Sequence, residues 1–134
     1  MDAIKRDRLI QELSERSDET LLISLNEFFD GNDDEGSIGC NLSRHPGVPT
    51  FRSVLQRVAA RMDVQNVLVQ VNEVDPGFGA WPFSDVVYVV GDIEQEVLKQ
   101  ELAVLEPDEV EPMTKDLPAP FPGSATKIFF VWWD

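Results

Sequence analysis

The sequence predicts an α+β fold, a two-layer sandwich in which about three helices cover one sheet of four or five strands. Two observations lead to this class. Segments with helical spacing of apolar residues alternate with short β-branched segments along the chain. Two of the strand-like segments are joined by too short a connection to be parallel, so the sheet should be largely antiparallel or mixed. A chain of 134 residues has the size of one domain, and we expect residues 1–134 to form a single one.

The first half of the chain predicts a helix, a strand and a second helix. Residues 2–16 place apolar side chains along one side of a helix, with charged residues over most of the rest. Residues 20–25 are apolar and β-prone, and turn-forming residues follow them, so we expect a strand that runs into a loop. Residues 50–62 give the clearest helix, because Pro49 suits its start and the apolar residues form one stripe. The stripe consists of Phe51, Val54, Leu55, Val58 and Met62.

The second half predicts three strands and one further helix. Residues 64–74 are rich in β-branched side chains and residues 86–90 are apolar, and the loop of about ten residues between them favours an antiparallel pair. Helical spacing returns over 93–105. The proline-rich stretch 112–123 predicts an extended loop, and 128–133 predicts a strand that is apolar on both faces. Such a strand lies inside a sheet that is covered on both sides, or its second face meets a partner.

Negative charge is the most unusual property of the composition. Asp and Glu number 25 against 11 Lys and Arg, which gives a formal charge of −14. Residues 19–39 carry −6 and residues 91–112 carry −7, and we expect the second stretch to be a helix exterior that extends the field of the first. Residues 40–64 form the one basic stretch, at only +3. Such a chain attracts basic proteins and repels nucleic acid and anionic membranes. We therefore expect a basic partner protein, and no binding to nucleic acid or membrane.

The acidic residues of the first stretch are densest between Asp30 and Glu35. This segment looks at first like a calcium-binding loop, but Glu35 and Asn41 stand where an EF-hand needs a glycine and a bidentate glutamate. We predict no specific metal site and interpret the segment as a loop that faces a partner, with nonspecific cation binding and a purely solvated loop as alternatives. The predicted partner-binding residues are Asp30, Asp33, Asp34, Glu35 and Trp81, the last as the best candidate for an exposed aromatic side chain beside the acidic loop.

Cys40 and His45 are the residue types used in nucleophilic catalysis, but no known catalytic motif surrounds them. We expect Cys40 to be a small buried thiol and His45 to be a loop residue. A pocket near these two residues, with Arg44 and the acidic loop, is the alternative hypothesis, that of a small enzyme or ligand-binding domain. The sequence contains no glycine-rich phosphate loop, nucleophile elbow or zinc-binding pair, so we predict no catalytic residue and no cofactor.

A single cysteine cannot form an intramolecular disulfide, which favours a reducing compartment. The first residues alternate in charge and lack the apolar core of a secretory signal, and no apolar run reaches the length of a membrane span. We expect a cytoplasmic protein that is a monomer or a weak homodimer. A homodimer would associate through the apolar strand at 128–133.

Three segments, 24–42, 81–85 and 131–134, resemble those of small acidic bacterial proteins of uncharacterised function. In overall character the chain is similar to the immunity proteins of bacterial toxin systems. That resemblance implies binding without catalysis, and it carries no site residue over. The leading hypothesis is therefore a non-catalytic domain that recognises a basic partner protein through its acidic loop.

Overall fold

The computed structural model describes residues 1–113 and 127–134. Within these residues the chain forms four α-helices, one short 3₁₀ helix and five strands. In chain order they are α1 (Ala3–Ser14), β1 (Leu21–Ser24), α2 (Leu25–Phe29), α3 (Val48–Ala59), β2 (Val64–Val71), β3 (Val86–Gly91), α4 (Gln95–Leu102), η1 (Ala103–Leu105), β4 (Glu109–Pro112) and β5 (Ile128–Trp132). The predicted α+β class is confirmed, with one helix more than the sequence suggests. From residue 114 on, the proline-rich loop predicted at 112–123 lies outside the described residues.

All five strands belong to one antiparallel sheet in the order β1-β2-β3-β5-β4. β2 and β3 form the antiparallel pair that the connection between them predicts, with Val69 opposite Val87. β5 lies between β3 and β4, so the strand that is apolar on both faces is an interior strand of the sheet. The interior position expected for residues 128–133 is confirmed, and the helices cover one of the two faces of the strand.

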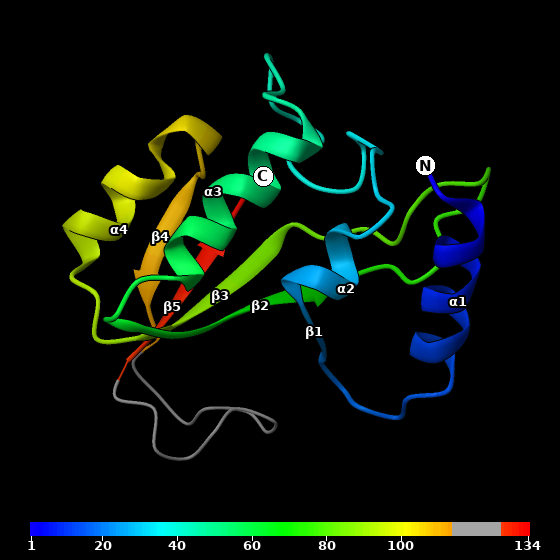
Figure 1. The fold of residues 1–134 in the computed structure, drawn as a ribbon, viewed down its shortest axis with the longest axis horizontal. Helices are drawn as coiled ribbons and strands as arrows, with labels where there is room; N and C mark the ends of the chain where they lie inside the picture. The colour runs from blue at the N-terminus through cyan, green and yellow to red at the C-terminus, as the bar shows by residue number, and fades with distance from the viewer. Residues whose placement is uncertain (114–126) are drawn as a thin grey trace.

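The helices pack on one face of the sheet and enclose the main core (Figure 1). α3 contributes most to it, because Phe51, Leu55 and Val58 are completely buried on the stripe that the sequence predicts. Pro49 lies in the first turn of α3, where a missing N–H costs nothing. The other helices add apolar pairs four residues apart: Leu9 and Leu13 of α1, Leu25 and Phe29 of α2, and Leu98 and Leu102 of α4.

The opposite face of the sheet carries a second, smaller apolar cluster. It comprises Leu22, Val86, Tyr88, Val90 and Ile128, with Leu68, Met113, Phe130 and Trp132 partly buried beside them. Along β3 and β5 these residues alternate with those of the main core. Both strands are therefore unbroken apolar runs in the sequence, as expected for strands with two apolar faces.

α2 and β4 are absent from the sequence-based expectation. α2 begins at a capping box, in which Ser24 Oγ accepts the N–H of Glu27 at 3.1 Å and Glu27 Oε1 accepts the N–H of Ser24 at 3.0 Å. The predicted strand 20–25 thus ends at Ser24 and continues into a helix instead of a loop. β4 forms because it pairs with β5, although glutamate and proline are poor strand residues, and Pro112 is tolerated since β4 is an edge strand.

Segments that are distant in sequence meet at one end of the molecule (Figure 1). The long loop between β2 and β3 passes beside the N-terminal end of α1, and hydrogen bonds tie the segment after α2 to both of them. α4, η1 and β4 lie at the opposite end. The fold therefore brings the acidic segment 30–35 and the loop between β2 and β3 together.

Candidate partner-binding site

The acidic loop, residues 30–35, follows α2 and is shaped by a buried asparagine. The side chain of Asn32 donates a hydrogen bond to Ser37 Oγ at 2.9 Å, and its Oδ1 accepts the N–H of Asp34 at 2.9 Å. Asn32 is buried, whereas Asp33 and Glu35 on either side of Asp34 are exposed. The loop consequently has a fixed backbone that displays some of its carboxylates to solvent.

Two of the predicted carboxylates bind the loop to α1. Asp30 accepts a hydrogen bond from Lys5 Nζ at 2.8 Å, and Asp33 accepts one from the N-terminal amine at 2.8 Å. The hydrogen bond from Lys5 holds the pKa of Asp30 below its usual value of 3.8. Because a cation lies beside each of them, Asp30 and Asp33 present less net negative charge than the sequence alone suggests.

Asp34 has a structural role, since both of its carboxylate oxygens accept backbone hydrogen bonds. Oδ1 accepts the N–H of Gly36 at 2.9 Å, and Oδ2 accepts the N–H of Trp81 at 3.1 Å. The second bond joins the acidic loop to the loop between β2 and β3. Glu35, in contrast, is exposed and makes no hydrogen bond or ion pair with any residue that the structure describes.

Trp81 is buried, with 1% of its surface exposed, so the expectation of an exposed tryptophan is wrong. Its side chain belongs to the main core, where a large aromatic ring removes the most apolar surface from water. The indole Nε1 is buried without a hydrogen-bond partner in the described part of the chain. Trp81 helps to build the site through its backbone N–H and does not present its ring to a partner.

The exposed aromatic side chain of this loop is Phe78, whose exposure is 110% of the reference value. Gly77, Phe78 and Gly79 all have positive φ, at +89°, +54° and +74°. The N–H of Ala80 donates to the carbonyl of Gly77 at 3.0 Å and closes a four-residue turn. Positive φ at both central residues is the pattern of a type I′ turn. A left-handed conformation costs a non-glycine residue about 1–2 kcal/mol, so Phe78 is both strained and exposed.

Sequence reasoning missed Phe78 because tryptophan is the stronger binding-site residue by type. The usable signal was the pair of glycines around it, after the turn-forming Asp75 and Pro76. Glycines on both sides of one residue indicate the tip of a tight turn, and the side chain at such a tip points into solvent. Position in the loop, and not residue type, decides which aromatic ring is exposed.

Arg6 of α1 holds the turn in place. Its Nε donates to the carbonyl of Ala80 at 2.7 Å, and its guanidinium also contacts Asp75 at 3.3 Å and Asp7 at 2.8 Å. The loop closes at its base, where the N–H of Phe83 donates to the carbonyl of Glu73 at 2.8 Å. Contacts on both sides of Phe78 thus fix the turn against α1.

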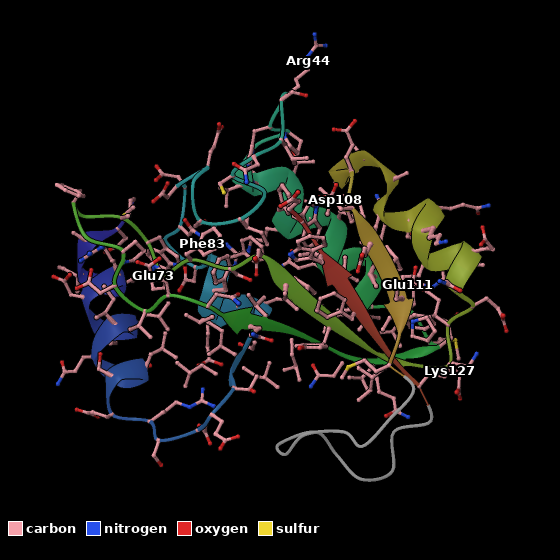
Figure 2. All side chains as sticks on the ribbon, turned by 180° about the vertical axis from the view of Figure 1, so that it is seen from behind. Arg44, Glu73, Phe83, Asp108, Glu111 and Lys127 are labelled. Atoms are coloured by element: carbon pink, nitrogen blue, oxygen red, sulfur yellow. The ribbon has the colours of Figure 1, made fainter. Side chains whose placement is uncertain are left out.

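The second acidic stretch, 91–112, lies at the other end of the molecule. Figure 2 shows Asp108 and Glu111 on the side of α4 and β4, whereas Glu73 and Phe83 lie on the side of α1. Part of this charge is also balanced, because Glu101 contacts Arg57 at 3.3 Å. The expectation that this stretch extends the field of the acidic loop is wrong, since the two patches occupy opposite ends.

The alternative site near Cys40 and His45 is not assembled. Cys40 is exposed, contrary to the expected buried thiol. His45 Nδ1 accepts the N–H of Gly47 at 2.9 Å, so its Nε2 carries the proton and donates to the carbonyl of Ile38 at 2.8 Å. Both ring nitrogens are engaged by the backbone and neither is available as a base. The adjacent hollow of about 450 Å³ is lined by Asn41, Leu42, Ser43, Asp108 and Asp134, and not by Cys40 or His45.

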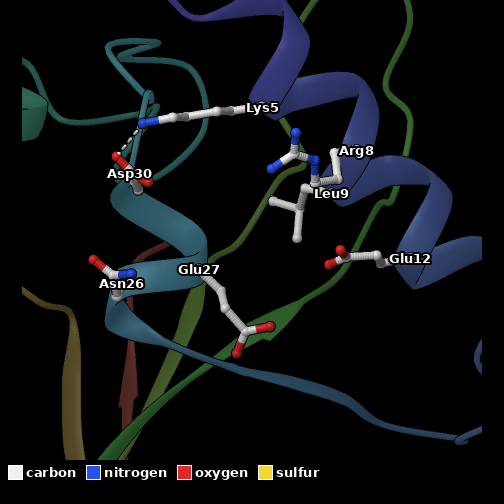
Figure 3. Close-up of a pocket in the computed structure, with 7 residues that line it drawn as sticks. All are labelled: Lys5, Arg8, Leu9, Glu12, Asn26, Glu27 and Asp30. Carbon is white, nitrogen blue, oxygen red and sulfur yellow. Dashed lines mark hydrogen bonds and ion pairs between the residues drawn. The ribbon is translucent and has the colours of Figure 1, made fainter.

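A smaller hollow of about 180 Å³ lies between α1 and α2 (Figure 3). It is lined by Lys5, Arg8, Leu9, Glu12, Asn26, Glu27 and Asp30. The Lys5–Asp30 ion pair spans the two helices, and the head groups of Glu12 and Glu27 point into the space between them. Its volume lies below the roughly 300 Å³ at which small-molecule pockets begin. Since its basic and acidic side chains oppose one another, the hollow favours neither a cation nor an anion.

Two further kinds of feature are absent from residues 1–113 and 127–134. No group of three or more His, Cys, Asp or Glu side chains in these residues is arranged to hold a metal ion. None of the helices in the same two segments combines the length and the apolar surface that a bilayer crossing requires.

These features define an acidic α+β protein in which an acidic loop and an aromatic turn form one surface. A protein-family model, that of the Uncharacterized protein YfbO family, matches residues 4–127. The match covers nearly the whole chain, and the chain belongs to this family. No curated protein and no solved structure matches the chain.

Proposed function

We propose that the chain is a non-catalytic protein-binding domain that recognises a basic partner protein through the surface formed by the acidic loop and the β2–β3 loop. The proposal includes an immunity-type role, in which binding neutralises the partner, in a cytoplasmic setting. The observation that carries it is the hydrogen bond between Asp34 and the backbone of Trp81, because it makes one fixed surface of two loops that are 47 residues apart.

The net charge of the proposed binding surface supports a basic partner protein. Residues 1–7, 30–35 and 73–80 contain eight carboxylates against Lys5, Arg6 and the N-terminal amine, a net charge of −5. Complementary charge accelerates association and disfavours partners of the same sign. The preformed loop backbone lowers the conformational entropy that binding must remove. The engaged ring nitrogens of His45 weigh against the alternative of a small enzyme.

The test is affinity capture from an extract of the source organism at low salt, with the purified full chain immobilised. The informative variant is Asp33→Asn/Glu35→Gln, because both side chains are exposed and Asp34, which holds the loop together, is left intact. The matched control is Glu94→Gln/Glu96→Gln at the other end of the molecule. Each pair removes two charges, and each contains one acid in an ion pair and one acid that forms none with the residues the structure describes.

We expect the wild-type chain and the Glu94/Glu96 variant to capture the same basic protein, and the Asp33/Glu35 variant to capture much less of it. Raising the salt concentration should weaken capture by the wild-type chain in the same way. Equal loss in both variants would mean that only overall charge matters. Capture of nothing by the wild-type chain would refute the proposed function.

A further inference from the structure

Phe78 is the strongest unexplained feature of the candidate surface. Its ring is fully exposed at the tip of the β2–β3 loop, so it contributes nothing to the core. Its backbone lies in the left-handed region at φ +54°, in a turn position where asparagine, aspartate or glycine is preferred. Neither the local backbone conformation nor burial within the chain accounts for a phenylalanine at this position.

The turn that carries Phe78 is held rigidly. Asp75 Oδ1 accepts the N–H of Gly77 at 3.1 Å, and Arg6 bonds to the carbonyl of Ala80 on the other side of the ring. A Cβ added at Gly77 or Gly79 would meet nothing within 4 Å, so the tip itself stands clear of the rest of the chain. Because the backbone of the turn is held before binding, less conformational entropy is lost when the ring enters a pocket.

The loop that carries the ring belongs to the surface of residues 1–7, 30–35 and 73–80, whose net charge is −5. Asp75 lies within the same loop, and Asp7 lies across Arg6 from it, while Asp34 joins the loop to the acidic segment that contains Glu35. An exposed aromatic side chain on a charged surface is typical of an interface centre with a polar rim. Its complement is an apolar pocket surrounded by basic side chains.

The net charge of each possible partner decides whether it can bind the acidic surface that carries Phe78. A second copy of the chain also has a net charge of −14 and would be repelled, as would an anionic membrane or nucleic acid. A basic protein is the occupant that both features fit. We infer that Phe78 is the central anchor of the binding surface and inserts into an apolar pocket within a basic surface of the partner protein. The inference rests on the proposed function and adds a single dominant contact to it.

The first test maps what Phe78 touches. Phe78 is replaced by the photo-crosslinking residue p-benzoyl-phenylalanine in the full chain, which is then irradiated in an extract of the source organism at low salt. Met62 receives the same substitution as a control, because its exposure of 105% matches that of Phe78 and it lies outside the candidate surface. We expect position 78, and not position 62, to form an adduct with a basic protein, on a peptide with apolar residues flanked by Lys or Arg.

The second test separates the loss of the ring from damage to the turn. Phe78→Asn removes the ring but places a residue favoured in this turn at the same position, so the variant should be at least as stable as the wild-type chain. We expect its affinity for the purified crosslinked partner to fall at least about tenfold, as for an interface hot spot. Met62→Ala should bind as the wild-type chain does.

The results can refute the anchor role of Phe78 separately from the proposed function on which it rests. If Asp33→Asn/Glu35→Gln abolishes capture while Phe78→Asn binds normally, the surface works by charge alone and the inference is wrong, although the proposed function stands. An adduct between two copies of the chain, or with lipid or nucleic acid, would also overturn the inference. If the wild-type chain captures nothing, both fail together.

Discussion

The backbone N–H of Trp81 donates a 3.1 Å hydrogen bond to the carboxylate of Asp34, and the other oxygen of the same carboxylate accepts the N–H of Gly36. One side chain therefore fixes its own loop and attaches it to a second one. Asp34, which the sequence suggests as a partner contact, instead holds the two loops together. The exposed charges around it are those of Asp33 and Glu35.

Asp34→Asn should destabilise the chain by about 1–3 kcal/mol. An amide has one acceptor oxygen in place of two, so either the Gly36 or the Trp81 N–H would face an NH₂ group and lose its bond. Urea unfolding gives the free energy difference. Asp33→Asn is the control, because it removes the same charge from an exposed site and should change stability by less than about 1 kcal/mol. Equal effects on stability in the two variants would show that the two hydrogen bonds of Asp34 do not stabilise the fold.

Trp81→Ala should cost about 3–5 kcal/mol of unfolding free energy, as other large buried aromatic residues do. The reason is the loss of packing around a ring that is 1% exposed within the main core. Thermal or urea unfolding monitored by circular dichroism measures the change. A cost below about 0.5 kcal/mol would instead indicate a surface position and would restore Trp81 as a candidate contact.

The sequence predicts much of the fold because its longer elements have strong periodic patterns. The helix predicted at 50–62 is observed as α3, which ends at Ala59, so the prediction of Met62 on its apolar stripe is wrong and Met62 is exposed. The strands predicted at 64–74 and 86–90 are β2 and β3. β4 could not be predicted from its own residues, since only the pairing with β5 makes a strand of Glu109–Pro112. α2 did have a readable signal, the capping box of Ser24 and Glu27.

The candidate site was less predictable than the fold. Asp30, Asp33, Asp34 and Glu35 do lie in one loop, but which of them are exposed depends on contacts with α1 and the β2–β3 loop. Those contacts join residues far apart in sequence, and a local pattern does not contain them. The sequence also predicts Trp81 as the exposed ring, whereas the structure exposes Phe78. The reason is again not local to the residue type, because backbone geometry at the turn decides which ring is exposed.

Gly91→Ala should be strongly destabilising, by at least about 2 kcal/mol. Gly91 has φ +154°, and a Cβ there would overlap the carbonyl oxygen of Asp63 and lie 2.8 Å from Val64 Cα, where the ladder between β2 and β3 is irregular. Gly79→Ala, at φ +74° with nothing within 4 Å of the added Cβ, should cost only backbone strain of about 1 kcal/mol. Urea unfolding of both variants compares the two costs, and a milder effect at Gly91 would contradict the described sheet.

Tyr88 is the only tyrosine, so its titration can be followed by tyrosinate absorbance. Burial raises the pKa of Tyr88 above its usual value of 10.0. The neutral phenol also donates to Gln70 Oε1 at 2.8 Å. The raised pKa means that the folded state favours the neutral form, so this stabilisation is complete below pH 10.0 and is lost as pH rises through the folded pKa. A titration midpoint at or below 10.0 in the folded protein would contradict the burial of Tyr88.

We expect the two joined loops at one end of the molecule to bind a basic protein. Amide NMR of the isotopically labelled full chain, titrated with the partner obtained by crosslinking, tests it most directly. Shifts and line broadening should concentrate in residues 30–36, residues 75–81 and the first turn of α1, and the signals of α4 and β4 should remain unchanged. Perturbations centred on α4 and β4, or on the apolar sheet face around Phe130 and Trp132, would contradict it.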